Sequence, residues 1–167
     1  TIEPNSGIVS VPDKRLNLLS NLAKSQKTIP AQMQFVDIAG LVSGASKGEG
    51  LGNKFLSHIR EVDAIIHVVR CFENTDITHV DNTINPLRDT ETIDTELMLA
   101  DLESLERQTQ NLSKKAKSND KEAKNDLVLM RKLTEFLSDG IQIRLANLTD
   151  VEKKKIKTFN LLTSKPV

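Results

Sequence analysis

The first half of the chain alternates short apolar runs with segments whose apolar residues recur at helical spacing. Residues 7–11 and 33–38 are short runs rich in apolar residues, and each ends at turn-forming residues, which predicts two strands. Residues 16–24 carry leucines at helical spacing, and residues 53–62 are a second plausible helix. Residues 64–71 (AIIHVVRC) are almost continuously apolar, which is typical of a strand covered on both faces. This alternation predicts an α/β sheet with crossover helices.

The pattern changes at about residue 91, where apolar positions begin to repeat in steps of three and four. The first series is Met98, Leu102, Leu105, Thr109, Leu112 and Ala116. After a short break a second series follows, namely Ala123, Leu127, Met130, Thr134 and Leu137. Two helices packed along one apolar seam satisfy both series. We therefore predict an antiparallel helical hairpin.

Two capping patterns set the expected starts of the later helices. Asn119 is followed three residues later by Glu122, which resembles a capping box at the start of the second hairpin helix. Thr149 and Glu152 have the same spacing and predict a third helix that runs to about Leu162.

Charge and cysteine content limit the classes of function. Lys and Arg together equal Asp and Glu together, at 23 each, so no net charge draws the protein to nucleic acid or membrane. No apolar run approaches the roughly 18 residues of a membrane span, and the single cysteine, Cys71, cannot form an internal disulfide. These features predict a cytoplasmic protein without a membrane partner. The chain starts at Thr1 and ends on an apolar segment, so we expect both ends to be cut from a longer polypeptide.

One short motif suggests phosphate chemistry. Asp37 ends a predicted strand, and Gly40 follows three residues later. An Asp at a strand end can hold a water of a magnesium ion, and a glycine can bring its backbone N–H up to a terminal phosphate. The same spacing also fits an ordinary turn. The long glycine-rich loop up to Gly52 favours the functional interpretation.

Longer segments around this motif resemble a known family. Residues 35–56 (FVDIAGLVSGASKGEGLGNKFL) closely resemble the switch II signature of Obg-related GTPases. Residues 1–5 (TIEPN) resemble switch I of the YchF branch, and residues 70–74 (RCFEN) with 85–86 (NP) also resemble that branch. The resemblance covers essentially the whole chain. It identifies the chain as a member of the YchF family of Obg-related P-loop GTPases and ATPases.

The resemblance implies a fold and a domain organisation. Residues 1–90 are expected to form part of a Ras-like P-loop nucleotide-binding domain, interrupted by a helical hairpin, or coiled coil, over residues 91–163. Residues 164–167 would begin the next strand of the nucleotide-binding domain. The sequence contains no G-x-x-x-x-G-K-[ST] motif, and the base-reading motif of the family is not in it either. We therefore expect this fragment alone to be only partly folded, to bind nucleotide no better than millimolar and to be inactive.

The resemblance also assigns roles to single residues. Thr1 matches the switch I threonine that binds Mg²⁺, Asp37 the switch II aspartate of the same metal site, and Gly40 the contact with the γ-phosphate. Leu41 stands where Ras-like enzymes have a glutamine that positions water, and an isobutyl group cannot orient a nucleophile. His79 matches a loop histidine proposed for that role in the family, although a solvated loop histidine is an equal alternative.

The remaining histidines have simpler interpretations. His67 lies inside the apolar run, so we predict a core histidine. His58 lies on a predicted helix, where an exposed polar residue is the simplest interpretation.

The resemblance implies a ribosome-associated, Mg²⁺-dependent hydrolase that converts ATP or GTP to the diphosphate and phosphate. Such a protein would act as a monomeric switch that reports its nucleotide state. Weak RNA contact is also implied, and the lysines at the hairpin tip, over residues 114–124, are one candidate surface. The residues leave one alternative open: a helical adaptor that binds RNA or the ribosome without hydrolysis.

Overall fold

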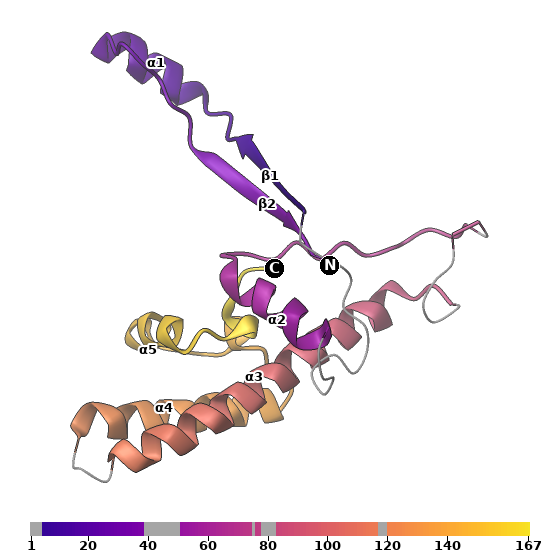
Figure 1. Ribbon diagram of the computed structural model, residues 1–167, viewed down its shortest axis with the longest axis vertical. Coiled ribbons are helices and arrows are strands. Elements are labelled where there is room, and N and C mark those ends of the chain that lie inside the picture. The colour runs from indigo at the N-terminus through magenta and orange to yellow at the C-terminus, as the bar shows by residue number, and fades with distance from the viewer. Residues whose placement is uncertain (1–4, 39–50, 75, 78–82, 117–119) are drawn as a thin grey trace. The chain divides into compact units, whose positions relative to one another are not determined.

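The chain divides into two compact units, Thr1–Gly40 and Leu41–Val167 (Figure 1). The computed structural model describes residues 5–38, 51–74, 76–77, 83–116 and 120–167. Each unit is described separately below.

The first unit is a strand, a helix and a second strand. β1 (Asn5–Ser10) pairs with β2 (Gln32–Asp37), and α1 (Lys14–Ala23) lies between them in the sequence. The side chain of Asp13 caps α1 by accepting a hydrogen bond from the Arg15 backbone N–H at 2.9 Å. The three predicted elements are therefore present. The pairing of β1 with β2 is antiparallel, whereas crossover helices connect parallel strands.

The predicted strand over residues 64–71 is wrong for the part of the chain that the structure describes. These residues have no regular secondary structure, and the described sheet contains β1 and β2 alone. Ile66 and Val68 are 71% and 88% exposed, and His67 is half-buried, so it is not a core histidine. A strand needs a neighbouring backbone to bond with. Among the described residues, the one such bond of this run joins Ile65 N to the carbonyl of Pro166, at 2.9 Å.

The second unit is mainly helical. α2 (Leu51–Glu61) begins two residues earlier than predicted and buries Leu56 and Ile59. His58 of α2 is half-buried, so the expectation of an exposed residue was wrong. α3 (Pro86–Ala116) starts with proline at its first position, and the Asn85 side chain accepts a hydrogen bond from Arg88 N at 3.1 Å. This cap places the start of α3 five residues before the predicted change at residue 91.

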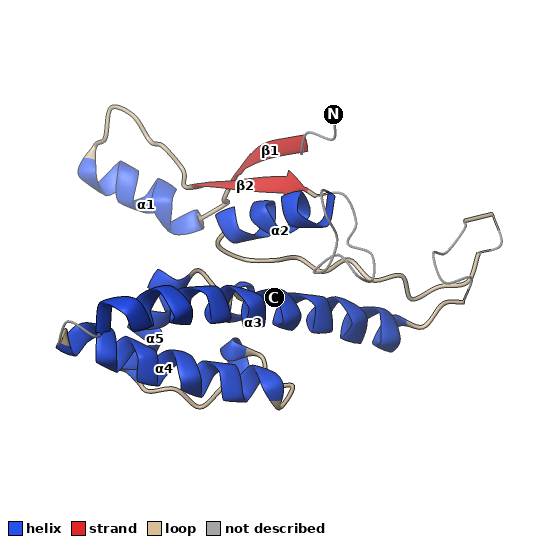
Figure 2. Ribbon diagram, turned by 60° about the horizontal axis from the view of Figure 1, so that its bottom comes forward, coloured by secondary structure: helices blue, strands red, loops and turns tan. Residues whose placement is uncertain are grey.

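α4 (Lys121–Ser138) packs against the C-terminal part of α3, and the N-terminal part of α3 extends beyond it (Figure 2). Leu105 of α3 and Leu133 of α4 are both completely buried, in one apolar cluster. Two packed helices are therefore present where the three-and-four repeat predicted them. Their description as a coiled coil inserted into a nucleotide-binding domain stays a prediction.

The cap of α4 differs from the prediction by one residue. Asp120 is the N-cap, and its carboxylate accepts hydrogen bonds from Glu122 N at 2.9 Å and Ala123 N at 3.2 Å. The capping side chain is the one directly before the first helical residue, Lys121, so Asp120 takes the place predicted for Asn119. Asn119 lies outside the described residues.

The third predicted helix is present but shorter. α5 (Asp150–Ile156) starts with the predicted capping box, in which Thr149 N donates to Glu152 Oε2 at 2.7 Å and Glu152 N to Thr149 Oγ1 at 3.3 Å. A 3₁₀ turn, η2 (Lys157–Phe159), follows. Asn160 then adopts a left-handed conformation with φ 52°, which a continuing helix does not allow. Two further short 3₁₀ turns are η1 (Ile143–Leu145) and η3 (Leu162–Ser164).

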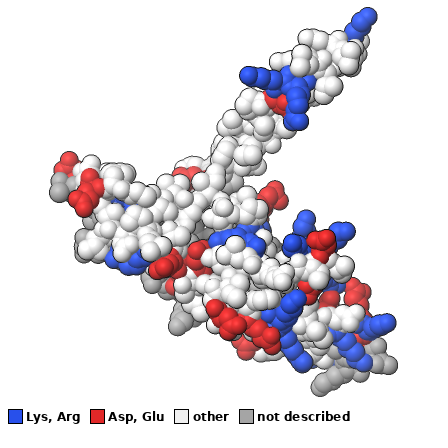
Figure 3. All heavy atoms as spheres, turned by 180° about the vertical axis from the view of Figure 1, so that it is seen from behind, with Lys and Arg blue, Asp and Glu red and all other residues white. Residues whose placement is uncertain are grey.

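The core of the second unit has a third layer besides α3 and α4. The segment after α4 buries a set of apolar side chains against the two helices, namely Ile143, Leu148, Ile156, Phe159 and Leu161. Acidic and basic side chains are interspersed on the face shown in Figure 3, as the balanced composition predicts. Within the described ranges, none of the helices combines the length and the apolar character that a membrane span requires.

An ion pair ties α5 to α4 and gives a first testable prediction. Glu152 Oε1 accepts a hydrogen bond from Lys132 Nζ at 2.7 Å, and this bond, with that from the Thr149 N–H, lowers the pKa of Glu152 from 4.5 to about 2. A lowered pKa means that the folded state favours the ionised carboxylate. Its contribution to stability is present above pH 4.5 and is lost as the pH falls towards 2.

We therefore expect the free energy of unfolding of Glu152→Gln to fall less between pH 4.5 and pH 2 than that of the wild type. Urea denaturation, followed by helical circular dichroism at a series of pH values, measures this slope. Glu103→Gln, on the exposed face of α3, is the control for the change in charge. If the free energy of unfolding depended on pH equally in the wild type and in Glu152→Gln, the lowered pKa of Glu152 would be contradicted.

Candidate functional site

Asp37 is the one predicted site residue that the structure describes. It is the last residue of β2, and its side chain is exposed. Within the described segments, no hydrogen bond or ion pair engages its carboxylate. The other three residues, Thr1, Gly40 and His79, lie outside the described residues, as does Leu41. Whether the four converge on one site is therefore still a prediction.

The register of the β1–β2 ladder constrains where the start of the chain can lie. Asn5 is paired directly opposite Asp37. Paired residues in an antiparallel ladder have Cα atoms about 4.5–5.5 Å apart, and four residues span at most about 14 Å. The length of the chain therefore allows the threonine four positions before Asn5 to reach Asp37, and the position of this threonine itself lies outside the described residues.

Asp37 offers one exposed carboxylate to a metal ion, and its assignment to Mg²⁺ stays a prediction. No group of three or more His, Cys, Asp or Glu side chains with metal-site geometry occurs among the described residues. Magnesium keeps several waters and is usually held by one or two carboxylates together with substrate phosphates. A single exposed carboxylate at a strand end is consistent with that mode of binding.

Arg70 organises the loop that leads towards residue 79, and the sequence analysis gave it no role. Its guanidinium donates hydrogen bonds to three backbone carbonyls, those of Phe72 at 3.0 Å, Asn74 at 2.8 Å and Ile77 at 2.9 Å. It also lies 5.1 Å from the centre of the Phe72 ring, within the range of a cation–π contact. The sequence offered one signal for a role of Arg70, namely a charged residue near the end of the apolar run over residues 64–71. Arg70 therefore holds the backbone at Phe72, Asn74 and Ile77.

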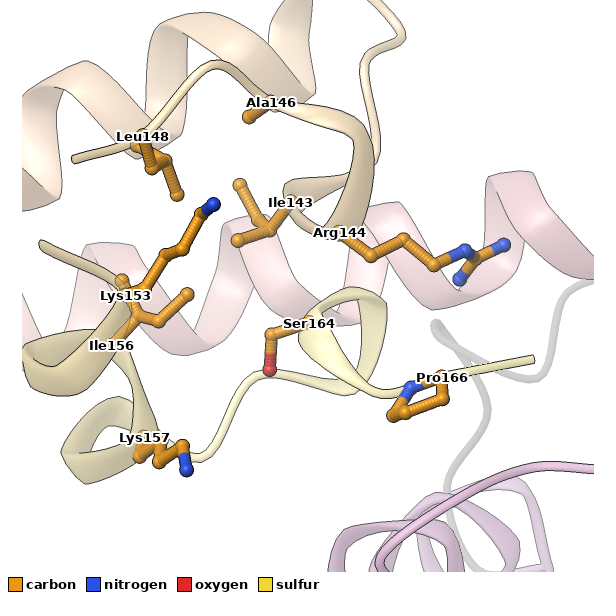
Figure 4. Close-up of a pocket in the computed structure, with 9 residues that line it drawn as sticks. All are labelled: Ile143, Arg144, Ala146, Leu148, Lys153, Ile156, Lys157, Ser164 and Pro166. Carbon is orange, nitrogen blue, oxygen red and sulfur yellow. The ribbon is translucent and has the colours of Figure 1, made fainter. Parts of the chain in front are cut away.

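A cavity of about 420 Å³ lies in the second unit, between η1, α5 and η3 (Figure 4). Apolar side chains and three cationic ones line it, and the guanidinium of Arg144 points away from the other lining groups in this view. The nine lining residues are Ile143, Arg144, Ala146, Leu148, Lys153, Ile156, Lys157, Ser164 and Pro166. None of the predicted site residues is among them. This cavity is therefore separate from the proposed phosphate chemistry.

Comparison with known proteins identifies the class. The model of the family described as "50S ribosome-binding GTPase" matches residues 1–101. A solved structure, that of the Schizosaccharomyces pombe YchF GTPase, superposes with a TM-score of 0.75 at 37% identity and covers 100% of this chain and 46% of that chain. These matches define a P-loop GTPase-like α/β protein.

Sequence relatives narrow the class to a family. "Ribosome-binding ATPase YchF" of Haemophilus influenzae is 57% identical over 166 residues, which are 99% of this chain and 46% of the relative. The protein of the same name from Bacillus subtilis is 51% identical over 167 residues, or 100% of this chain and 46% of the relative. The chain belongs to the YchF family, as the segments at residues 1–5, 70–74 and 85–86 predicted. It spans about half the length of the curated relatives that it matches.

Proposed function

We propose that the complete gene product carrying this chain is a ribosome-associated nucleotide hydrolase that acts as a nucleotide-state switch. Its substrate is ATP or GTP, which it converts to the nucleoside diphosphate and phosphate. The observation that carries the proposal is the position of Asp37 at the end of β2, three residues before Gly40, in a segment typical of switch II. The names of the relatives, a ribosome-binding ATPase and a GTPase, support both the reaction and the partner.

In the proposed site, Asp37 would hold a water of the Mg²⁺ ion, and the hydroxyl of Thr1 would bind the ion. The backbone N–H of Gly40 donates to the γ-phosphate, where a side chain would prevent close approach. When bound, magnesium neutralises the charge that develops on the phosphate oxygens. The β1–β2 register supports this arrangement, because it pairs Asn5, which follows Thr1 by four residues in the sequence, with Asp37.

His79 is proposed to orient the attacking water. Leu41 has no polar group for this task, and a neutral imidazole can accept a hydrogen bond from water near neutral pH. The loop that Arg70 fixes leads directly towards this histidine. Residues 1–167 contain no G-x-x-x-x-G-K-[ST] motif, so these residues by themselves are proposed to bind nucleotide weakly and to be inactive. We further propose that the complete gene product is a cytoplasmic monomer that contacts RNA weakly.

Asp37→Asn in the complete gene product tests the metal site. Asparagine keeps the size of the side chain but removes the charge, and loss of a group that orients a metal's bound ligand costs about 10–100-fold in activity or metal affinity. We expect turnover of ATP and of GTP to fall by that factor and the requirement for magnesium to rise. Steady-state phosphate release over a magnesium titration measures both effects.

Asp13→Asn is the matched control, because Asp13 is bound to Arg15 and lies at the start of α1. Unchanged turnover in Asp37→Asn would remove Asp37 from the metal site.

His79→Ala in the same assay tests the water-orienting role. Turnover of the nucleotide should fall, while the affinity for the nucleotide is retained.

A helical adaptor is the second candidate function, and the packed pair α3 and α4 favours it. In that case the hairpin binds RNA or the ribosome, and the nucleotide chemistry is dispensable. Ribosome co-sedimentation with and without nucleotide separates the two functions. Binding that is the same in every nucleotide state, in a protein without hydrolysis, would favour the adaptor.

A further inference from the structure

The C-terminal end of α2 is held by residues from the far end of the chain, which lie beside it in Figure 1. Arg60 Nη1 donates to the carbonyl of Asn160 at 2.7 Å. In the opposite direction, Lys165 Nζ donates to the carbonyls of Arg60, at 3.0 Å, and of Val62. The last carbonyls of a helix have no partner within the helix, so a cation there both satisfies them and interacts favourably with the helix dipole. Burial lowers the pKa of Lys165.

The same C-terminal residues are tied to α3 by a buried carboxylate. Asp101 is completely buried, and it accepts three hydrogen bonds of 2.8 Å, from Leu162 N, Thr163 N and Thr163 Oγ1. Its Oδ1 also lies 3.8 Å from Arg60 Nη1. Burial raises the pKa of Asp101, and the three hydrogen bonds and the charge of Arg60 oppose that rise. One side chain of α3 is therefore in contact with α2 and with the C-terminal segment.

We propose that Arg60, Asp101 and Lys165 form a latch through which a movement of α2 is transmitted to α3. The inference rests on the proposed function, because α2 directly follows, in sequence, the glycine-rich segment that resembles switch II. If that segment rearranges with the nucleotide, the end of α2 is displaced together with Arg60 and with the carbonyls that Lys165 binds. Through the latch this displacement moves α3, and α3 in turn moves α4, against which it packs.

Arg60 is the part of the latch that can be removed without removing the fold. Without Arg60, Asp101 keeps its three hydrogen bonds to Leu162 and Thr163. α2 keeps its own apolar contacts, because Leu56 and Ile59 stay buried. Arg60→Met retains most of the aliphatic length of the side chain and loses both the bond to Asn160 and the attraction to Asp101. Lys165→Met removes the second set of contacts independently.

The test is hydrogen–deuterium exchange of the complete gene product with and without Mg²⁺ and a non-hydrolysable ATP analogue. In the wild type, nucleotide binding is expected to alter the rate of amide exchange both next to α2 and in α3, over residues 86–101. In Arg60→Met and in Lys165→Met, the change next to α2 should persist while the change in α3 is lost. Arg107→Met is the matched control, since Arg107 lies on α3 and pairs only with Glu103 among the described residues. It should behave as wild type.

The outcomes separate the latch from the function on which it rests. If the wild type and both latch variants show the same nucleotide-dependent change in α3, the latch is overturned and the hydrolase proposal stands. A wild-type change confined to α2 also overturns the latch alone. If nucleotide changes exchange nowhere and no phosphate is released, both proposals fall. Helical circular dichroism of each variant reports whether it is folded.

Discussion

Replacing Leu133 with alanine is expected to lower the free energy of unfolding of the helical unit by about 2–5 kcal/mol. Leu133 is completely buried in α4, in the apolar cluster that also contains Leu105 of α3. Alanine would remove three carbon atoms and leave a cavity that the surrounding side chains fill only in part. Urea denaturation monitored by helical circular dichroism measures the change.

Val128→Ala in the same helix is the control for Leu133→Ala. Val128 is 67% exposed, so its truncation should change the free energy of unfolding by no more than about 0.5 kcal/mol. A loss below about 1 kcal/mol for Leu133→Ala would show that α4 is not packed as described.

Leu133 also illustrates the limit of the three-and-four repeat. The repeat indicated one seam between two helices, and it correctly included Leu105, Met130 and Leu137. It missed Leu129, and it took Thr134 in place of Leu133, although Leu133 has the same spacing, three residues after Met130 and four before Leu137. Both leucines belong to the apolar cluster that also contains residues of the segment after α4. Spacing alone did not distinguish such candidates, because contacts with residues distant in sequence decide which of them is buried.

Local signals were more successful than long-range ones. The capping box of Thr149 and Glu152 was predictable because both partners lie within four residues. The cap of α4 was displaced by one residue, because consecutive polar residues before Lys121 offer more than one candidate. The run at 64–71 has strand-like composition, but pairing requires another segment of chain, and composition does not specify one. Asn160 is an exception among the local features. Its left-handed backbone ends the last helical turns, but this conformation was not predicted.

The candidate site was predicted from two kinds of information. Asp37 at the end of a strand followed from the local pattern, and the structure places it there. The roles of Thr1, Gly40 and His79 came from resemblance to a family rather than from geometry. Arg70 and Asp101 were not anticipated, because most of their partners are backbone groups that lie outside a recognised capping pattern. Outside such a pattern, a hydrogen bond to a backbone group leaves no signature in the sequence.

Asp101→Ala is the second substitution with a large expected effect, and it acts through polar groups rather than packing. Truncation leaves the backbone N–H groups of Leu162 and Thr163 buried without an acceptor. Each unsatisfied buried donor costs about 1–3 kcal/mol, and removing one partner of a buried polar network costs about 3–5 kcal/mol in total. We expect a loss of stability in that range, measured by urea denaturation at neutral pH.

Two further variants separate the hydrogen bonds from other effects of the substitution. Glu103→Ala lies two residues further along α3 and is more than half exposed, so it should cost no more than about 0.5 kcal/mol. Thr163→Val removes one of the three donors to Asp101 and also the acceptor of the buried Ile143 N–H, but it retains both backbone N–H bonds to Asp101. Its cost should be about 1–3 kcal/mol. If Asp101→Ala were no more harmful than Thr163→Val, the two backbone bonds would contribute little. The C-terminal segment would then be held by its apolar residues, Leu161 and Leu162, and not by the carboxylate.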